Sequence, residues 1–90
     1  MADHLEVATW MLGRFNAEGR IEQRTIAQEI RAKFGNQYVY ENENGHLGIA
    51  PRVLYHFGIM TKETAVWARV GRYWRKRLPT DPPGVRKIEE

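Results

Sequence analysis

The sequence has 90 residues, 42% hydrophobic and 28% charged, which is enough for one hydrophobic core and too few for two. It contains no cysteine, which excludes disulfides and thiolate metal sites, so stability has to come from packing. The N-terminal residues lack the basic start and apolar run of a secretory signal, and no stretch approaches a membrane span. We therefore expect a cytoplasmic protein without membrane contact.

The net charge of +3 is distributed unevenly along the chain. Residues 1–50 carry five basic and seven acidic side chains, whereas residues 51–80 carry seven basic side chains and one acidic one. Such asymmetry is typical of proteins with an anionic partner or with a charged surface between copies of the chain.

The first residues predict an amphipathic helix. Asp3 and Glu6 have the spacing of a capping box, and the apolar residues that follow recur at helical intervals. We expect this helix over about residues 4–17, ended by Gly19 in the left-handed conformation.

A second helix is predicted to begin after Glu22 and to end at Gly35. Its inward stripe consists of apolar side chains, namely Ile26, Ala27, Ile30 and Phe34. Glu29 and Lys33 have the spacing of an exposed i,i+4 ion pair. Ile21 is expected in a short strand between the two helices.

The segment between Gly35 and Ala50 is expected to fold as an inserted turn or small hairpin. The run Tyr38-Val39-Tyr40 is typical of a strand, and Asn44-Gly45 is suited to positive φ angles.

A third helix is predicted from Pro51, which presets the φ angle of a first helical residue. Its inward side is expected to hold Val53, Leu54 and Phe57. Its outward side would then show Arg52, Tyr55 and His56.

The C-terminal half predicts a β-hairpin of residues 65–70 and 73–78 joined by a two-residue turn at Gly71-Arg72. In this register Trp67 and Trp74 lie diagonally on one face, and Arg75 and Arg77 lie on the other. We expect one domain over residues 1–78, followed by a proline-rich linker and a loose tail over residues 79–90.

Helix, short strand, helix, helix and hairpin is the element order of a winged helix-turn-helix, in which the hairpin is the wing. The predicted fold class is therefore α+β and winged-helix-like, with three helices. The long segment between the second and third helices departs from the tight turn of a helix-turn-helix.

The sequence also resembles a group of small uncharacterised bacterial single-domain proteins. The resemblance covers roughly residues 21–77 and rests on the runs Tyr38-Val39-Tyr40, Asn42-Glu43-Asn44-Gly45, Val53-Leu54 with Phe57, Val66-Trp67 and Tyr73-Trp74-Arg75. It implies a self-contained domain and carries over no activity, cofactor or site residue. Ala50 departs from the capping Asp or Ser expected before the third helix.

No motif of the sequence predicts an enzyme, a metal site or a cofactor. The three histidines have no partner at metal-ligand spacing. Glu41, Glu43 and His46 lie close together and are titratable, but turn chemistry explains them more simply than acid-base catalysis.

Basic and aromatic residues alternate in the C-terminal half, which is the composition of a nucleic-acid surface. The predicted nucleic-acid-binding residues are Arg52, Tyr55, His56, Arg69, Arg72, Arg75, Lys76 and Arg77. We expect a small non-enzymatic domain that binds duplex DNA through a basic wing. The alternative is a protein-interaction module or homodimer, because tryptophans in a hairpin are often core and a free sheet edge invites pairing.

Overall fold

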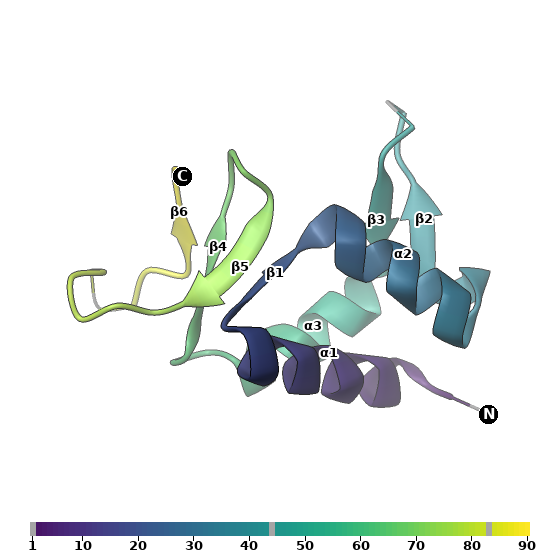
Figure 1. Cartoon of the computed structure of the whole chain (residues 1–90), viewed down its shortest axis with the longest axis horizontal. Helices are drawn as coiled ribbons and strands as arrows, with labels where there is room; N and C mark the ends of the chain where they lie inside the picture. The colour runs from purple at the N-terminus through teal and green to yellow at the C-terminus, as the bar shows by residue number, and fades with distance from the viewer. Residues whose placement is uncertain (1, 44, 83) are drawn as a thin grey trace.

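The computed structural model describes residues 2–43, 45–82 and 84–90 (Figure 1). Its helices are α1 (His4–Glu18), α2 (Gln23–Phe34), the single 3₁₀ turn η1 (Asn36–Tyr38) and α3 (Pro51–Met60). Its strands are β1 (Arg20–Glu22), β2 (Val39–Glu41), β3 (Leu47–Ile49), β4 (Ala65–Ala68), β5 (Tyr73–Lys76) and β6 (Lys87–Ile88). The α+β class predicted from the sequence is confirmed.

The strands form two sheets on either side of α2 (Figure 1). The larger sheet has the order β1-β5-β4-β6, in which β5 is antiparallel to both neighbours and β6 is parallel to β4. The smaller sheet is the β2–β3 hairpin. The larger sheet therefore lies beyond the N-terminal end of α2, and the β2–β3 hairpin rises beside the helix (Figure 1).

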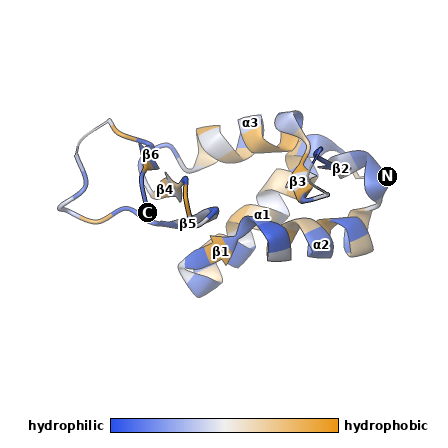
Figure 2. Ribbon diagram, turned by 90° about the horizontal axis from the view of Figure 1, so that it is seen from above, coloured by the Kyte–Doolittle hydropathy of each residue, from blue (hydrophilic) through white to orange (hydrophobic). Residues whose placement is uncertain are grey.

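The core lies where α1 packs against α3, under α2. Phe15 of α1 and Phe57 of α3 are at most 1% exposed and meet edge to face, with ring centroids 6.1 Å apart. In Figure 2 parts of α3 have the orange of hydrophobic residues, whereas much of α2 has the blue of hydrophilic residues. The predicted first helix is confirmed, since Asp3 accepts a hydrogen bond from the Glu6 N–H and Gly19 has a φ angle of 76°.

The inward side of α3 differs in one residue from the prediction. Val53 and Phe57 are buried as expected, but Leu54 is only half-buried. Arg52 and Tyr55 are exposed as expected, and His56 is half-buried with its ring against that of Tyr55. The helix is thus turned slightly, which leaves Leu54 at the edge of a surface groove described below.

The inserted segment between α2 and α3 is held in place by Tyr38. This residue was expected in a strand but lies in η1, with its side chain 3% exposed and its hydroxyl donating to the Ala2 carbonyl. The N–H of Ala50 in turn donates to the Tyr38 carbonyl over 2.9 Å. Gly45 has the expected positive φ, 76°, and Asn44 lies outside the described residues.

The predicted register of the β4–β5 hairpin is wrong. Ala68 pairs with Tyr73, so the connecting loop has four residues, 69–72, rather than two. Trp67 therefore faces Trp74 directly, with ring centroids 4.5 Å apart, and not diagonally. The two-residue shift in pairing keeps each side chain on its predicted face, because side chains alternate along a strand with a period of two.

Two further expectations are corrected, one by an ion pair and one by backbone hydrogen bonds. Glu29 accepts from Arg14 of α1 instead of pairing with Lys33, which ties α2 to α1. The segment expected as a loose tail contains β6, since Trp67 N–H donates to the Arg86 carbonyl over 2.8 Å and Arg69 N–H donates to the Ile88 carbonyl over 2.9 Å. The exposed edge of β4 provides the hydrogen-bonding groups that a short extended segment needs.

The packing of α3 gives a first prediction. Replacing Phe57 by Ala should lower the free energy of unfolding by about 3–5 kcal/mol, because a fully buried ring is lost and a cavity is left. Replacing Tyr55, which is 65% exposed, by Ala should change it by about 0.5 kcal/mol or less. Urea denaturation of both variants measures the difference, and equal costs would mean that α3 faces the core with another side.

Candidate functional site

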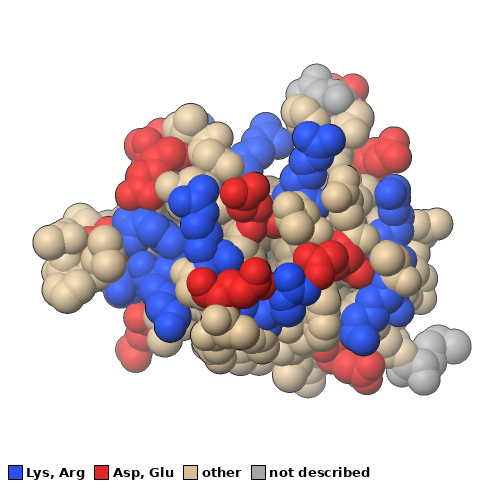
Figure 3. Space-filling view, viewed as in Figure 1, with Lys and Arg blue, Asp and Glu red and all other residues tan. Residues whose placement is uncertain are grey.

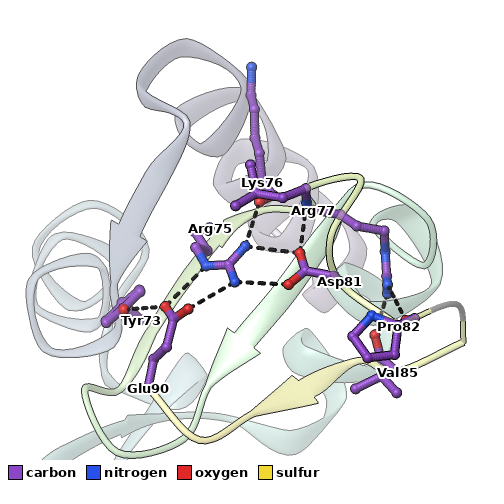
Figure 4. A network of polar contacts seen from close by, with 9 residues as sticks. Tyr73, Arg75, Lys76, Arg77, Asp81, Pro82, Val85 and Glu90 are labelled. Carbon is purple, nitrogen blue, oxygen red and sulfur yellow. Dashed lines mark hydrogen bonds and ion pairs between the residues drawn. The ribbon is translucent and has the colours of Figure 1, made fainter.

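Arg75, which was expected to bind phosphate, is held by two carboxylates of the C-terminal segment (Figure 4). Its two terminal nitrogens donate to the Asp81 carboxylate, each over 3.0 Å. Its Nε and Nη2 also donate to Glu90, over 3.1 and 2.9 Å. We call these three residues the Arg75 clamp. The Arg75 side chain is only 16% exposed, so this face of the hairpin offers little free charge.

Two other predicted cations of the hairpin also contact the C-terminal segment. Arg77 donates to the carbonyls of Pro82 and Val85. Arg69 pairs with Glu89 over 3.3 Å, with both side chains largely exposed. Three of the arginines that the sequence predicted for DNA, Arg69, Arg75 and Arg77, therefore contact the described part of the C-terminal segment.

The clamp changes the titration of its carboxyl groups. The hydrogen bonds from Arg75, together with the Leu78 N–H, lower the pKa of Asp81 from an ordinary 3.8 to about 2. Arg75 and the Tyr73 hydroxyl lower the pKa of Glu90, and the hydrogen bond to Glu90 raises the pKa of Tyr73. Hydrogen bonds to a charged carboxylate favour its ionised form, so both acids strengthen the clamp at neutral pH.

Four other predicted residues make no side-chain hydrogen bond or ion pair with the described part of the C-terminal segment. Arg52, Tyr55 and His56 lie on α3, a different element. Lys76 is exposed on β5, where its N–H donates to the Gly19 carbonyl. The eight predicted residues thus come from two parts of the fold, the β4–β5 hairpin with the residue after it and α3.

A groove of about 590 Å³ lies between the two hairpins, and we call it the hairpin groove. Its lining includes Arg24, Gln28 and Arg31 of α2, His46 near β3, and Arg72 at the tip of the β4–β5 hairpin. Glu22 and Glu41 also contribute to the lining. In the described part of the chain, the three arginines make no ion pair or hydrogen bond through their side chains, so their charges face the groove uncompensated by a contacting carboxylate.

Arg72 is placed in the hairpin groove by its backbone. Its carbonyl accepts a hydrogen bond from the Gln23 N–H at the start of α2, over 3.0 Å, and its own N–H donates to the Ala68 carbonyl over 2.8 Å. Its φ angle of 57° is in the left-handed region, which is uncommon for a residue with a side chain. The loop tip is therefore fixed against α2.

The space-filling view shows Lys and Arg side chains in the gap between the two hairpins (Figure 3). Carboxylates also lie among them and elsewhere on this face, and Glu22 and Glu41 belong to the groove lining, so the surface is not uniformly basic. Sequence reasoning found Arg72 but missed Arg24 and Arg31. Their spacing with Gln28, at i, i+4 and i+7, was the available signal, because these positions share one face of a helix.

The described residues contain no group of three or more metal-ligating side chains. Within the same residues, no helix has the length and apolar character needed to cross a bilayer.

Residues 3–76 match a family described as a family of unknown function (DUF6953). The chain belongs to this family. Neither the curated proteins nor the solved structures contain a match to it. The family match ends at the last residue of β5, so Arg75 lies inside it while its partners Asp81 and Glu90 lie beyond it.

The Arg75 clamp gives a second prediction. Because the pKa of Asp81 is lower in the folded state than in the unfolded state, its stabilisation is complete above about pH 4 and is lost as the pH falls toward about 2. Asp81→Asn should therefore be less stable than the wild type near neutral pH, and its stability should depend less on pH between about pH 5 and about pH 2.

Thermal melting across this pH range measures the effect. Glu89→Gln is the control, because its ion pair with Arg69 is exposed and contributes little. An Asp81→Asn variant with the wild-type pH profile would show that the clamp does not stabilise the fold.

Proposed function

We propose that this protein is a winged-helix-like, non-enzymatic domain that binds duplex nucleic acid through the hairpin groove. The observation that carries the proposal is the set of three arginines without internal partners, two on α2 and one on the facing hairpin tip. The sequence predicted binding through the strand face of the wing, but Arg75 and Arg77 on that face already donate to Asp81 and to the Pro82 carbonyl. We therefore assign binding to the hairpin groove instead.

The sheet topology supports the winged-helix assignment. β1 follows the first helix and pairs with β5, the second strand of the hairpin, so the hairpin is joined to the helices as a wing is. The inserted β2–β3 hairpin separates α2 from α3 and adds a second wall beside α2. In this arrangement the helical side chains that line the groove, Arg24, Gln28 and Arg31 among them, come from α2 and not from α3.

The groove chemistry favours a phosphate backbone. Arginine binds phosphate oxygens through paired N–H donors, and three such side chains converge here. Gln28 is a residue type that hydrogen-bonds adenine edges, and a carboxylate such as Glu41 accepts from a cytosine amino group. None of the described lining residues is Phe, Tyr or Trp, the large rings on which the bases of a single strand usually stack, so the groove favours a duplex over a single strand.

Binding to a mixed-sequence duplex at several salt concentrations tests the proposal. We expect affinity to fall steeply with salt, because each neutralised phosphate releases counterions. Replacing Arg31 and Arg72 together by Ala should weaken binding and flatten the slope of log K against log salt by up to about 1.8, from about 0.9 per contact.

The control variant, Lys33→Ala with Lys62→Ala, removes the same charge outside the groove and should leave the slope nearly unchanged. An equal loss in both variants would show a nonspecific charge effect. A wild type that fails to bind even at low salt would contradict the proposal.

A protein-interaction or homodimeric role is the second candidate, and α3 favours it. Tyr55 and Ile59, one turn apart, are 65% and 57% exposed and form an apolar stripe. Such a stripe is suited to another protein surface rather than to a phosphate backbone.

If this stripe makes a dimer, light scattering should report twice the monomer mass at micromolar concentration. Tyr55→Asp with Ile59→Asp should then give a monomer that still melts cooperatively. A wild type that is monomeric throughout this range would exclude the dimer.

A further inference from the structure

A second groove, of about 390 Å³, lies between α3 and the sheet, and we call it the tryptophan groove. Its floor contains Phe57 and Leu54 of α3 and the facing pair Trp67 and Trp74 of the hairpin. Arg86 and Lys87 of the C-terminal segment lie at its side. The groove therefore exists as described only because β6 is paired with β4.

The floor offers aromatic edges and faces to a ligand. The Phe57 and Trp74 rings meet at 5.4 Å and an angle of 73°, and the two indoles are tilted by 45°. Trp67, Trp74 and Leu54 are each half-buried, so part of every one remains accessible. A flat aromatic ring can pack edge to face or offset against such a surface, which adds to the gain from burial.

The charged side chains that line the tryptophan groove are both basic. None of the described residues that line the groove is acidic. One nitrogen of Arg86, Nη2, donates to the Gly58 carbonyl over 2.6 Å, which leaves further guanidinium donors. The side chain of Lys87 makes no hydrogen bond or ion pair with any described residue. An anionic group on a ligand would thus meet two cations and no repelling carboxylate.

From this combination we propose that the tryptophan groove binds a small aromatic carboxylate. The ring lies against Trp67 and Trp74, and the carboxylate accepts hydrogen bonds from Lys87 and Arg86. A small apolar site with a few convergent polar groups is the usual form of a ligand pocket. The two grooves share Gln23 in their lining, and the proposed site uses none of the arginines of the hairpin groove.

The position of the three tryptophans allows a direct test. Trp67 and Trp74 lie in the groove, whereas Trp10 packs in α1 against Phe34, with ring centroids 5.7 Å apart. In ¹H–¹⁵N spectra of the full chain, titration with 2-naphthoate should shift the indole N–H signals of Trp67 and Trp74 in a saturable way. The Trp10 signal should stay in place and serves as the internal reference.

The uncharged analogue 2-naphthamide tests the role of the carboxylate in the wild type. It has the same ring and should bind about tenfold more weakly, because it loses charge-assisted hydrogen bonds. Lys87→Gln should weaken 2-naphthoate binding about tenfold and leave 2-naphthamide unaffected. Lys62→Gln removes the same charge outside the groove and should have no effect.

Arg86→Gln is informative only if β6 stays paired, which the hydrogen-exchange protection of the Trp67 and Arg69 amides reports. The same control applies to Lys87→Gln, because Lys87 lies in β6, whereas the naphthamide comparison uses the wild type and needs no such control. The proposal is overturned if 2-naphthoate leaves the groove indoles unshifted, if Trp10 shifts with them, or if acid and amide bind equally.

Discussion

The Arg75 clamp is the interaction on which the C-terminal half of this structure depends. The Arg75 guanidinium binds two carboxylates, that of Asp81, which precedes β6 in the chain, and that of Glu90, which follows it. A charge-assisted, bidentate contact of this kind is among the stronger hydrogen-bonded pairs in proteins. It holds β6 against β4, and with β6 it fixes one side of the tryptophan groove. The same contacts remove Arg75 from the set of charges open to a phosphate.

Three arginines that have no ion pair with a described residue, Arg24, Arg31 and Arg72, lie instead where the two hairpins stand beside α2. The inserted segment could have left α2 open on that side, but Tyr38 packs between α1 and α2 and donates to the Ala2 carbonyl. Its burial fixes the β2–β3 hairpin as one wall, and the hydrogen bond from Gln23 to the Arg72 carbonyl fixes the other. Local packing, rather than net charge, thus decides which arginines are left without an internal partner.

The helices were predictable because their signals are local. The Asp3 cap, the glycines at residues 19 and 35 and the apolar spacing each act within a few residues of the element they define. The hairpin register and β6 were not predictable, since they depend on contacts such as Arg75 with Glu90, which are distant in sequence. For the same reason a run of basic residues could not show which of its members were already paired, and the exposed stripe of α2 was overlooked.

The central claim is that the arginines of this domain divide into an internal set and a binding set. Titration of the protein with a mixed-sequence duplex, observed through the arginine Nε–H signals in ¹H–¹⁵N spectra, tests this division directly. The claim predicts that the signals of Arg24, Arg31 and Arg72 shift on binding while that of Arg75 stays in place. Shifts of Arg75 and Arg77 with unchanged groove arginines would contradict it, because they would show that the duplex displaces the C-terminal segment and binds the wing face.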